Sequence, residues 1–147
     1  MLKEALLEIF ERDLDKLANE INSYADEDKL WIIDGEVSNS AGNLCLHLLG
    51  NLNHFVGATL GASGYVRNRE SEFSSKNVSR RDLLASIEKT KSAVSKTLNK
   101  LSGGSFERDF PAEKHDKTVK TDFMLLHLLA HFNYHLGQIN YHRRLTA

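Results

Sequence analysis

The stretch LKEALLEIFERDLDKLANEINSY, residues 2–24, places apolar side chains three or four positions apart along its whole length. Glu, Lys, Asp and Arg occupy the positions between them. This spacing is typical of an α-helix that buries one face and exposes the other. It predicts a helix from residue 2 to about residue 25.

Three later segments share this periodicity, and each is preceded by residues that favour a helix N-terminus. The predicted helices are a second from Ser38 or Ser40 to about residue 60, a third from Ser79 to about residue 101, and a last from a Thr121 cap to about residue 145. Polar connections separate them, and the longest spans residues 61–78. Four such helices favour an all-α four-helix bundle, with residues 1–147 as a single domain.

The composition is that of a soluble globular protein: 41% of the 147 residues are hydrophobic, 27% are charged, and the net charge is −1. This balance argues against nucleic-acid binding, and no apolar run is long enough to cross a membrane. The N-terminal segment is not expected to be a secretory signal. Cys45 is the only cysteine, which excludes an intrachain disulfide and favours a cytoplasmic location. Its leucine neighbours predict a buried thiol.

The stretch HLLAHFNYHLGQ, residues 127–138, carries histidines at 127, 131 and 135. Two imidazoles four residues apart lie on the same face of a helix and can share a metal ion. His47 lies on the apolar face of the second predicted helix, so it can face the last helix across a bundle core. Three histidines leave one coordination position open, as in catalytic zinc sites, and nitrogen ligands also suit nickel. Alternatively, histidines scattered along a dimerisation helix need no metal.

Three segments carry a family resemblance: NSAGNLCLHLLGNL (39–52), GYVRNRESEF (64–73) and LLAHFNYHLGQINYHRR (128–144). Together they resemble the DinB-like (YfiT-like) superfamily of metal-dependent hydrolases, within a subgroup of unknown function. The resemblance implies an up-down-down-up four-helix bundle with a long connection between helices 2 and 3. It also implies a homodimer, and a divalent metal, zinc or nickel, held by His47, His131 and His135.

The resemblance leaves His127 outside the ligand set. Helical geometry gives weaker support for the same assignment. His127 and His135 lie about 80° apart around the helix axis, so one ion is reached more easily by an adjacent pair of histidines than by all three. His54 is a candidate for the mouth of the pocket. His115 and His142 are expected at the surface or at a helix end.

Several polar residues are candidates to line or support the site. Asn51 and Gln138 are placed to do so, although helix packing explains both more simply. In the connection, Arg67, Arg69 and Glu70 either bind an anionic group of a substrate or form ion pairs that order the chain. Ordering of the chain is the favoured interpretation.

No carboxylate stands beside these histidines in sequence, unlike the HExxH motif, in which a glutamate serves as general base. Some DinB-like proteins resemble S-transferases that use a low-molecular-weight thiol, a chemistry that needs no protein base. We therefore expect a metal-dependent enzyme acting on a small molecule, of thiol S-transferase or hydrolase type. The alternative is a catalytically silent metal-binding bundle with a stress-response or scaffold role.

Overall fold

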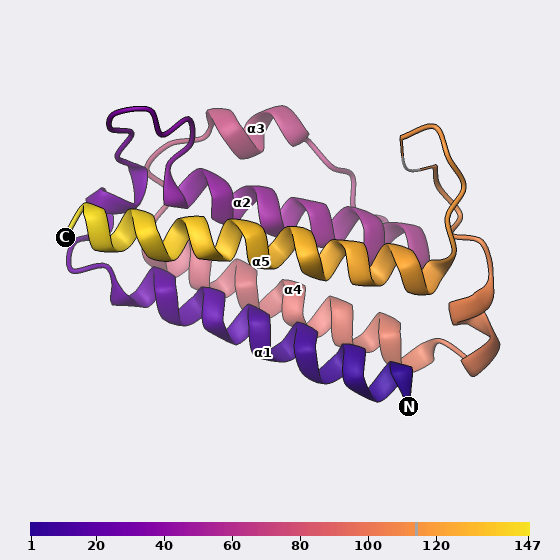
Figure 1. Ribbon diagram of the computed structural model, residues 1–147. Coiled ribbons are helices and arrows are strands. Elements are labelled where there is room, and N and C mark those ends of the chain that lie inside the picture. The colour runs from indigo at the N-terminus through magenta and orange to yellow at the C-terminus, as the bar shows by residue number, and fades with distance from the viewer. Residues whose placement is uncertain (114) are drawn as a thin grey trace.

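The computed structural model describes residues 1–113 and 115–147, and it confirms that the chain is all-helical. The long helices are α1 (Leu2–Ser23), α2 (Ala41–Leu52) with its continuation η2 (Asn53–Leu60), α4 (Arg80–Lys100) and α5 (Thr121–Leu145) (Figure 1). The short ones are η1 (Glu27–Trp31), α3 (Arg69–Ser74) and η3 (Gly103–Glu107). Within the described residues no β-strand forms, and one antiparallel bridge pairs Asp109 with Lys120.

The long helices lie side by side around a shared core. In Figure 1, α1 and α5 run from right to left, whereas α2 and α4 run from left to right. Helix α1 packs against α4 and α5, and α2 packs against the same two helices. The stripe predicted for the first helix is the one that is buried; its buried hydrophobic members are Leu6, Phe10, Leu14, Leu17 and Ile21.

Two of the three predicted N-cap positions are confirmed. The side chain of Ser40 accepts a hydrogen bond from the backbone N–H of Asn43, and that of Ser79 accepts one from Asp82. Thr121 is not a cap, because it is already the first helical residue. Its hydroxyl donates to the carbonyl of Arg108 instead, at 3.0 Å.

The second helix changes its winding near its end. From Asn53 to Leu60 the backbone forms a π-helix, whereas the sequence predicted an ordinary helix to about residue 60. The hydroxyl of Thr59 donates to the carbonyl of His54, five residues earlier. The wider turn changes the direction of every side chain after Asn53, including that of His54.

The connection between residues 61 and 78 is not an irregular linker, because it contains α3. Asn68 caps this short helix by accepting from the backbone N–H of Ser71. In Figure 1, α3 lies along the outer side of α2. This arrangement brings a part of the chain that is distant in sequence next to the second helix.

The buried side chain of Asn43 fastens α3 to α2. Its amide nitrogen donates to the carbonyls of Glu72 and Ser75, at 2.9 and 2.8 Å. Its amide oxygen accepts from the Ser40 hydroxyl and from the Lys76 ammonium group, at 2.7 and 2.9 Å. Three of these four hydrogen bonds join the start of α2 to α3 or to the chain that follows it, and the bond from Ser40 lies within the start of α2.

Replacing Asn43 with alanine should lower the free energy of unfolding by about 2–3 kcal/mol, because two carbonyls lose their donor in a buried environment. Urea denaturation measures this change. Asn99→Ala, at an exposed position of α4, is the control and should change stability by less than about 0.5 kcal/mol. Equal stabilities for the two variants would contradict the role assigned to Asn43.

Cys45 is fully buried, as predicted, and burial raises the pKa of its thiol to about 12, so the thiol is not a nucleophile at neutral pH.

His142, expected at the surface or a helix end, lies in the last turn of α5, but it is buried there. Its Nδ1 lies 2.7 Å from the Tyr24 hydroxyl and its Nε2 lies 2.8 Å from the Ile32 carbonyl. Its place near the chain end concealed the partners that the first helix and the following connection supply.

None of the described helices combines the length and the apolar character needed to cross a membrane.

Candidate metal centre

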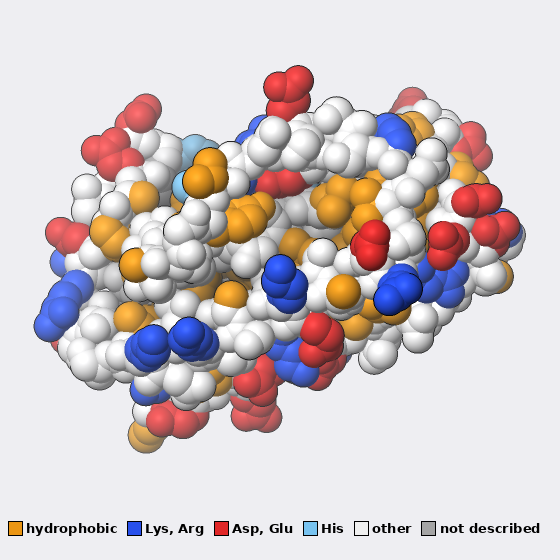
Figure 2. Space-filling view, turned by 180° about the vertical axis from the view of Figure 1, so that it is seen from behind, with side chains coloured by type: hydrophobic (Ala, Val, Ile, Leu, Met, Phe, Trp, Pro, Cys, Tyr) orange, Lys and Arg blue, Asp and Glu red, His pale blue; other side chains and the backbone are white. Residues whose placement is uncertain are grey.

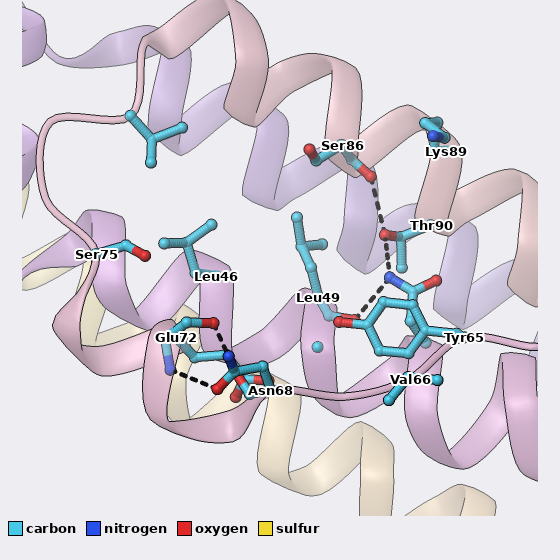
Figure 3. Close-up of a pocket in the computed structure, with 14 residues that line it drawn as sticks. Leu46, Leu49, Tyr65, Val66, Asn68, Glu72, Ser75, Ser86, Lys89 and Thr90 are labelled. Carbon is cyan, nitrogen blue, oxygen red and sulfur yellow. Dashed lines mark hydrogen bonds between the residues drawn. The ribbon is translucent and has the colours of Figure 1, made fainter.

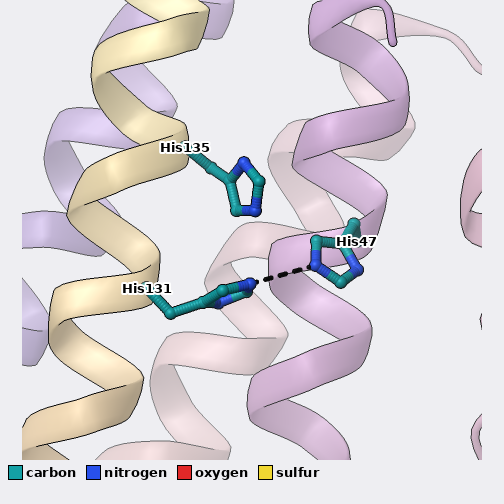
Figure 4. Close-up of side chains that lie close together, drawn as sticks. All are labelled: His47, His131 and His135. Atoms are coloured by element: carbon teal, nitrogen blue, oxygen red, sulfur yellow. Dashed lines mark hydrogen bonds between the residues drawn. The ribbon is translucent and has the colours of Figure 1, made fainter. Parts of the chain in front are cut away.

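Three histidines from two helices meet between α2 and α5. His47 comes from α2, and His131 and His135 come from consecutive turns of α5. One nitrogen from each ring lies within 4.8 Å of the corresponding nitrogen of the other two. Figure 4 shows the three rings directed toward one another, with Nε2 of His47 3.1 Å from Nε2 of His131.

This spacing suits a shared metal ion. A tetrahedral ion with bonds of about 2.0–2.1 Å to nitrogen holds its ligand atoms about 3.3 Å apart. The contact between His47 and His131 is already near that value. His135 is only half-buried, which leaves room for its ring to adjust toward the other two.

The outer nitrogen of His47 faces a buried carboxylate. Nδ1 of His47 lies 3.0 Å from Oε1 of Glu72, in α3, and the Glu72 side chain is 6% exposed. With Nδ1–H donating to Glu72, the Nε2 lone pair of His47 is directed at the other two histidines. Metal-bound histidines commonly donate to a carboxylate in this way, which fixes the ring and strengthens the ligand.

Arg67 also holds Glu72 in place, and its Nη2 lies 3.3 Å from Nδ1 of His47. Its Nε lies 2.8 Å from Oε2 and its Nη2 lies 2.9 Å from Oε1, so the guanidinium group grips the carboxylate with two hydrogen bonds. This ion pair accords with the favoured interpretation, in which the arginines order the connection. It also offsets the cost of burying the charge of Glu72.

The sequence contained no signal for Glu72. It lies 25 residues from its histidine partner, in a segment interpreted as a long polar linker. No carboxylate stands beside the histidines in sequence, but the fold brings one next to His47 in space. The adjacent Asn68 cap was the one local sign of a helix there.

Burial keeps the imidazole of His47 neutral. Burial lowers the pKa of His47 below the usual value of a histidine, whereas the hydrogen bond to Glu72 and the charge of Glu72 raise it. The net direction is downward. The neutral form is the one that binds a metal ion.

Gln138 supports the third histidine. Its Oε1 lies 2.7 Å from Nδ1 of His135, one turn earlier on α5. When Nδ1–H donates to this oxygen, Nε2 of His135 is left for the centre of the cluster. The rings of His47 and His135 are thus each oriented by a partner outside the cluster.

The remaining candidates divide into two groups. Asn51, Arg67 and His127 line a small pocket that opens beside His47 and His131. His54 does not line it, and its ring contacts Phe55 with 4.7 Å between the ring centroids. The wider turn of η2 explains why Phe55, rather than His54, reaches the pocket.

A second, larger hollow lies on the other side of Glu72. It has a volume of about 390 Å³ and lies between α2, α4 and the connection that carries α3 (Figure 3). From behind, Figure 2 shows a hollow with hydrophobic side chains in its floor. No histidine of the cluster lines it, so the chemistry of the site belongs to the smaller pocket.

Replacing Glu72 with glutamine should weaken metal binding about 10- to 100-fold, because the outer acceptor of His47 loses its charge. Competition with a chromophoric chelator measures the affinity. Glu70→Gln removes an exposed carboxylate from the same short helix and should leave the affinity unchanged. The role of Glu72 is contradicted if the two variants bind zinc equally well.

The fold and the site together define an all-helical protein with a cluster of three histidines between two of its helices. The model of the family described as "Protein of unknown function (DUF1572)" matches residues 3–146, and the chain belongs to this family. No curated protein and no solved structure matches the chain.

Proposed function

We propose that this protein is a DinB-like, metal-dependent enzyme that acts on a small molecule, as a thiol S-transferase or a hydrolase. The observation that carries the proposal is the meeting of His47, His131 and His135 beside a pocket. The helix directions in Figure 1 support the up-down-down-up arrangement of one DinB-like domain over residues 1–147.

In this proposal the three histidines hold one divalent ion, zinc or nickel. A bound ion of this kind supplies a Lewis acid with an open position, which lowers the pKa of a coordinated water or thiol. Glu72 and Gln138 hold the ligand rings in orientation. Asn51 and His127 line the space beside them, where a substrate is positioned.

No carboxylate of the described residues lines the pocket, so none is placed to act as a general base there. Arg67 grips Glu72 with two hydrogen bonds, so that carboxylate is committed to holding His47. This favours the transferase over the hydrolase, because a thiol loses its proton at a metal ion more easily than water does.

Assays with the metal-loaded protein separate the alternatives. Electrophiles are presented with and without several low-molecular-weight thiols, and conjugates are measured by mass spectrometry. Product that requires both the metal and a thiol supports the transferase, and metal-dependent hydrolysis without a thiol supports the hydrolase. Binding of the metal with neither activity would favour a catalytically silent bundle with a stress-response or scaffold role.

We further propose a homodimer formed through α5. Five large hydrophobic side chains of this helix are more than half exposed: Phe123, Leu126, Tyr134, Tyr141 and Leu145. Burying such a surface favours association. Sedimentation should show a dimer that Tyr134→Glu dissociates; an unchanged dimer would exclude this surface.

A further inference from the structure

The pocket beside the three histidines has a definite size and chemical character. Its volume is about 230 Å³, which corresponds to about eight water molecules at about 30 Å³ each. Phe55 and Leu128 supply apolar walls, and His47 and His131 form the side next to the cluster. A pocket of this size suits a small molecule.

Two guanidinium groups line the same pocket, and none of its lining residues is acidic. Arg67 is already paired with Glu72, so its charge is compensated. Arg69 is different: no carboxylate of the described residues lies within 4.0 Å of it, and its guanidinium carbon lies 5.2 Å from the centroid of the Phe73 ring. The pocket therefore presents one guanidinium group that has no carboxylate of the described residues beside it.

Arg69 is exposed, and its guanidinium group lies over the ring of Phe73. A guanidinium group over an aromatic face keeps its N–H groups, which lie in its plane, available for an acceptor. A planar guanidinium recognises a carboxylate or a phosphate with two parallel hydrogen bonds. Arg69 thus has the geometry and the charge to hold an anion at the pocket.

We propose that this pocket binds a small organic anion, with one carboxylate or phosphate group paired to Arg69. A short apolar chain of the ligand lies against Phe55 and Leu128, and its neighbouring atoms reach the three histidines. This inference rests on the proposed function and names its substrate class. It also separates the two arginines, because Arg67 orders the connection and Arg69 recognises the substrate.

Binding to the metal-free protein tests the inference, because it does not depend on whether the histidines hold an ion. Pentanoate, pentyl phosphate and the neutral pentanamide are titrated into isotope-labelled protein in the presence of a chelator, and backbone NMR shifts are followed. We expect at least one anion to bind with shifts at Phe55 and Leu128. The amide should bind at least about tenfold more weakly, because it lacks the charge that Arg69 recognises.

Arg69→Gln should weaken anion binding about tenfold or more, whereas Arg81→Gln, at an exposed position of α4, should not change it. Equal binding of the amide and both anions would overturn the inference. So would shifts confined to the hollow on the other side of Glu72, or an Arg69→Gln variant that binds anions as well as the wild type. If the wild-type protein binds the anions but binds no metal ion, that result counts against the proposed function and leaves this inference standing.

Discussion

Replacing His131 with alanine should abolish tight binding of zinc or nickel. His131 supplies the nitrogen that lies 3.1 Å from the corresponding nitrogen of His47, so its loss removes the connection between the two helices of the site. The affinity should fall by more than the roughly 100-fold that loss of an outer partner costs, because a coordinate bond is lost outright. Equilibrium dialysis followed by elemental analysis measures the change.

His127→Ala is the matched control, one turn earlier on the same helix. His127 lines the pocket but is not part of the three-histidine cluster, so its removal should leave metal affinity within about threefold of wild type. The ligand assignment is wrong if His127 is indispensable and His47 is dispensable.

Gly50→Ala should destabilise the protein by about 2–4 kcal/mol, although alanine is the better helix former by about 1 kcal/mol. A methyl group at position 50 would overlap the carboxylate of Glu72, which lies against the backbone of α2. Glu72 would have to leave, and Arg67 and His47 would both lose their partner. Overpacking and a broken buried ion pair each cost a few kcal/mol.

Replacing Gly137 with alanine should change the free energy of unfolding in the opposite direction. Gly137 is exposed within α5, and a methyl group there meets no atom within 4 Å, so Gly137→Ala should stabilise by about 1 kcal/mol. Thermal and urea denaturation, compared in the same oligomeric state, measure both changes. Equal stability of Gly50→Ala and Gly137→Ala would contradict the close contact between Glu72 and Gly50. Metal affinity should fall with the first variant only.

The long helices and the three histidines were predictable because their signals are periodic. The apolar stripe of α1 and the spacing of His131 and His135 are each contained within one helix, where sequence spacing and spatial neighbourhood agree. The addition of His47 rested on its apolar face and on the family resemblance. The structure brings these three residues together.

Glu72 was not predictable, for a physical reason. Its position depends on Asn43, which bonds two carbonyls of the distant connection, and on Gly50, which leaves room for the carboxylate. Neither residue has a pattern that points to position 72. The contact between His47 and Glu72 joins residues 25 positions apart, and it needs the space left by Gly50. Such a contact leaves no periodic pattern in the sequence.

Arg67 and Arg69 show the same limit. The two residues stand two positions apart in RNRESEF, and charge alone does not distinguish them. Their roles differ because Glu72 pairs with Arg67, while Arg69 stacks on Phe73 at the pocket. The question between loop ordering and anion recognition therefore receives a different answer for each arginine.

Anomalous X-ray diffraction from crystals of the zinc- or nickel-loaded protein, recorded at the metal absorption edge, tests the central claim most directly. We expect about one strong peak per chain, at about 2.0–2.1 Å from the ring nitrogens of His47, His131 and His135. A peak at other residues, or no peak between α2 and α5 in metal-saturated crystals, would contradict it.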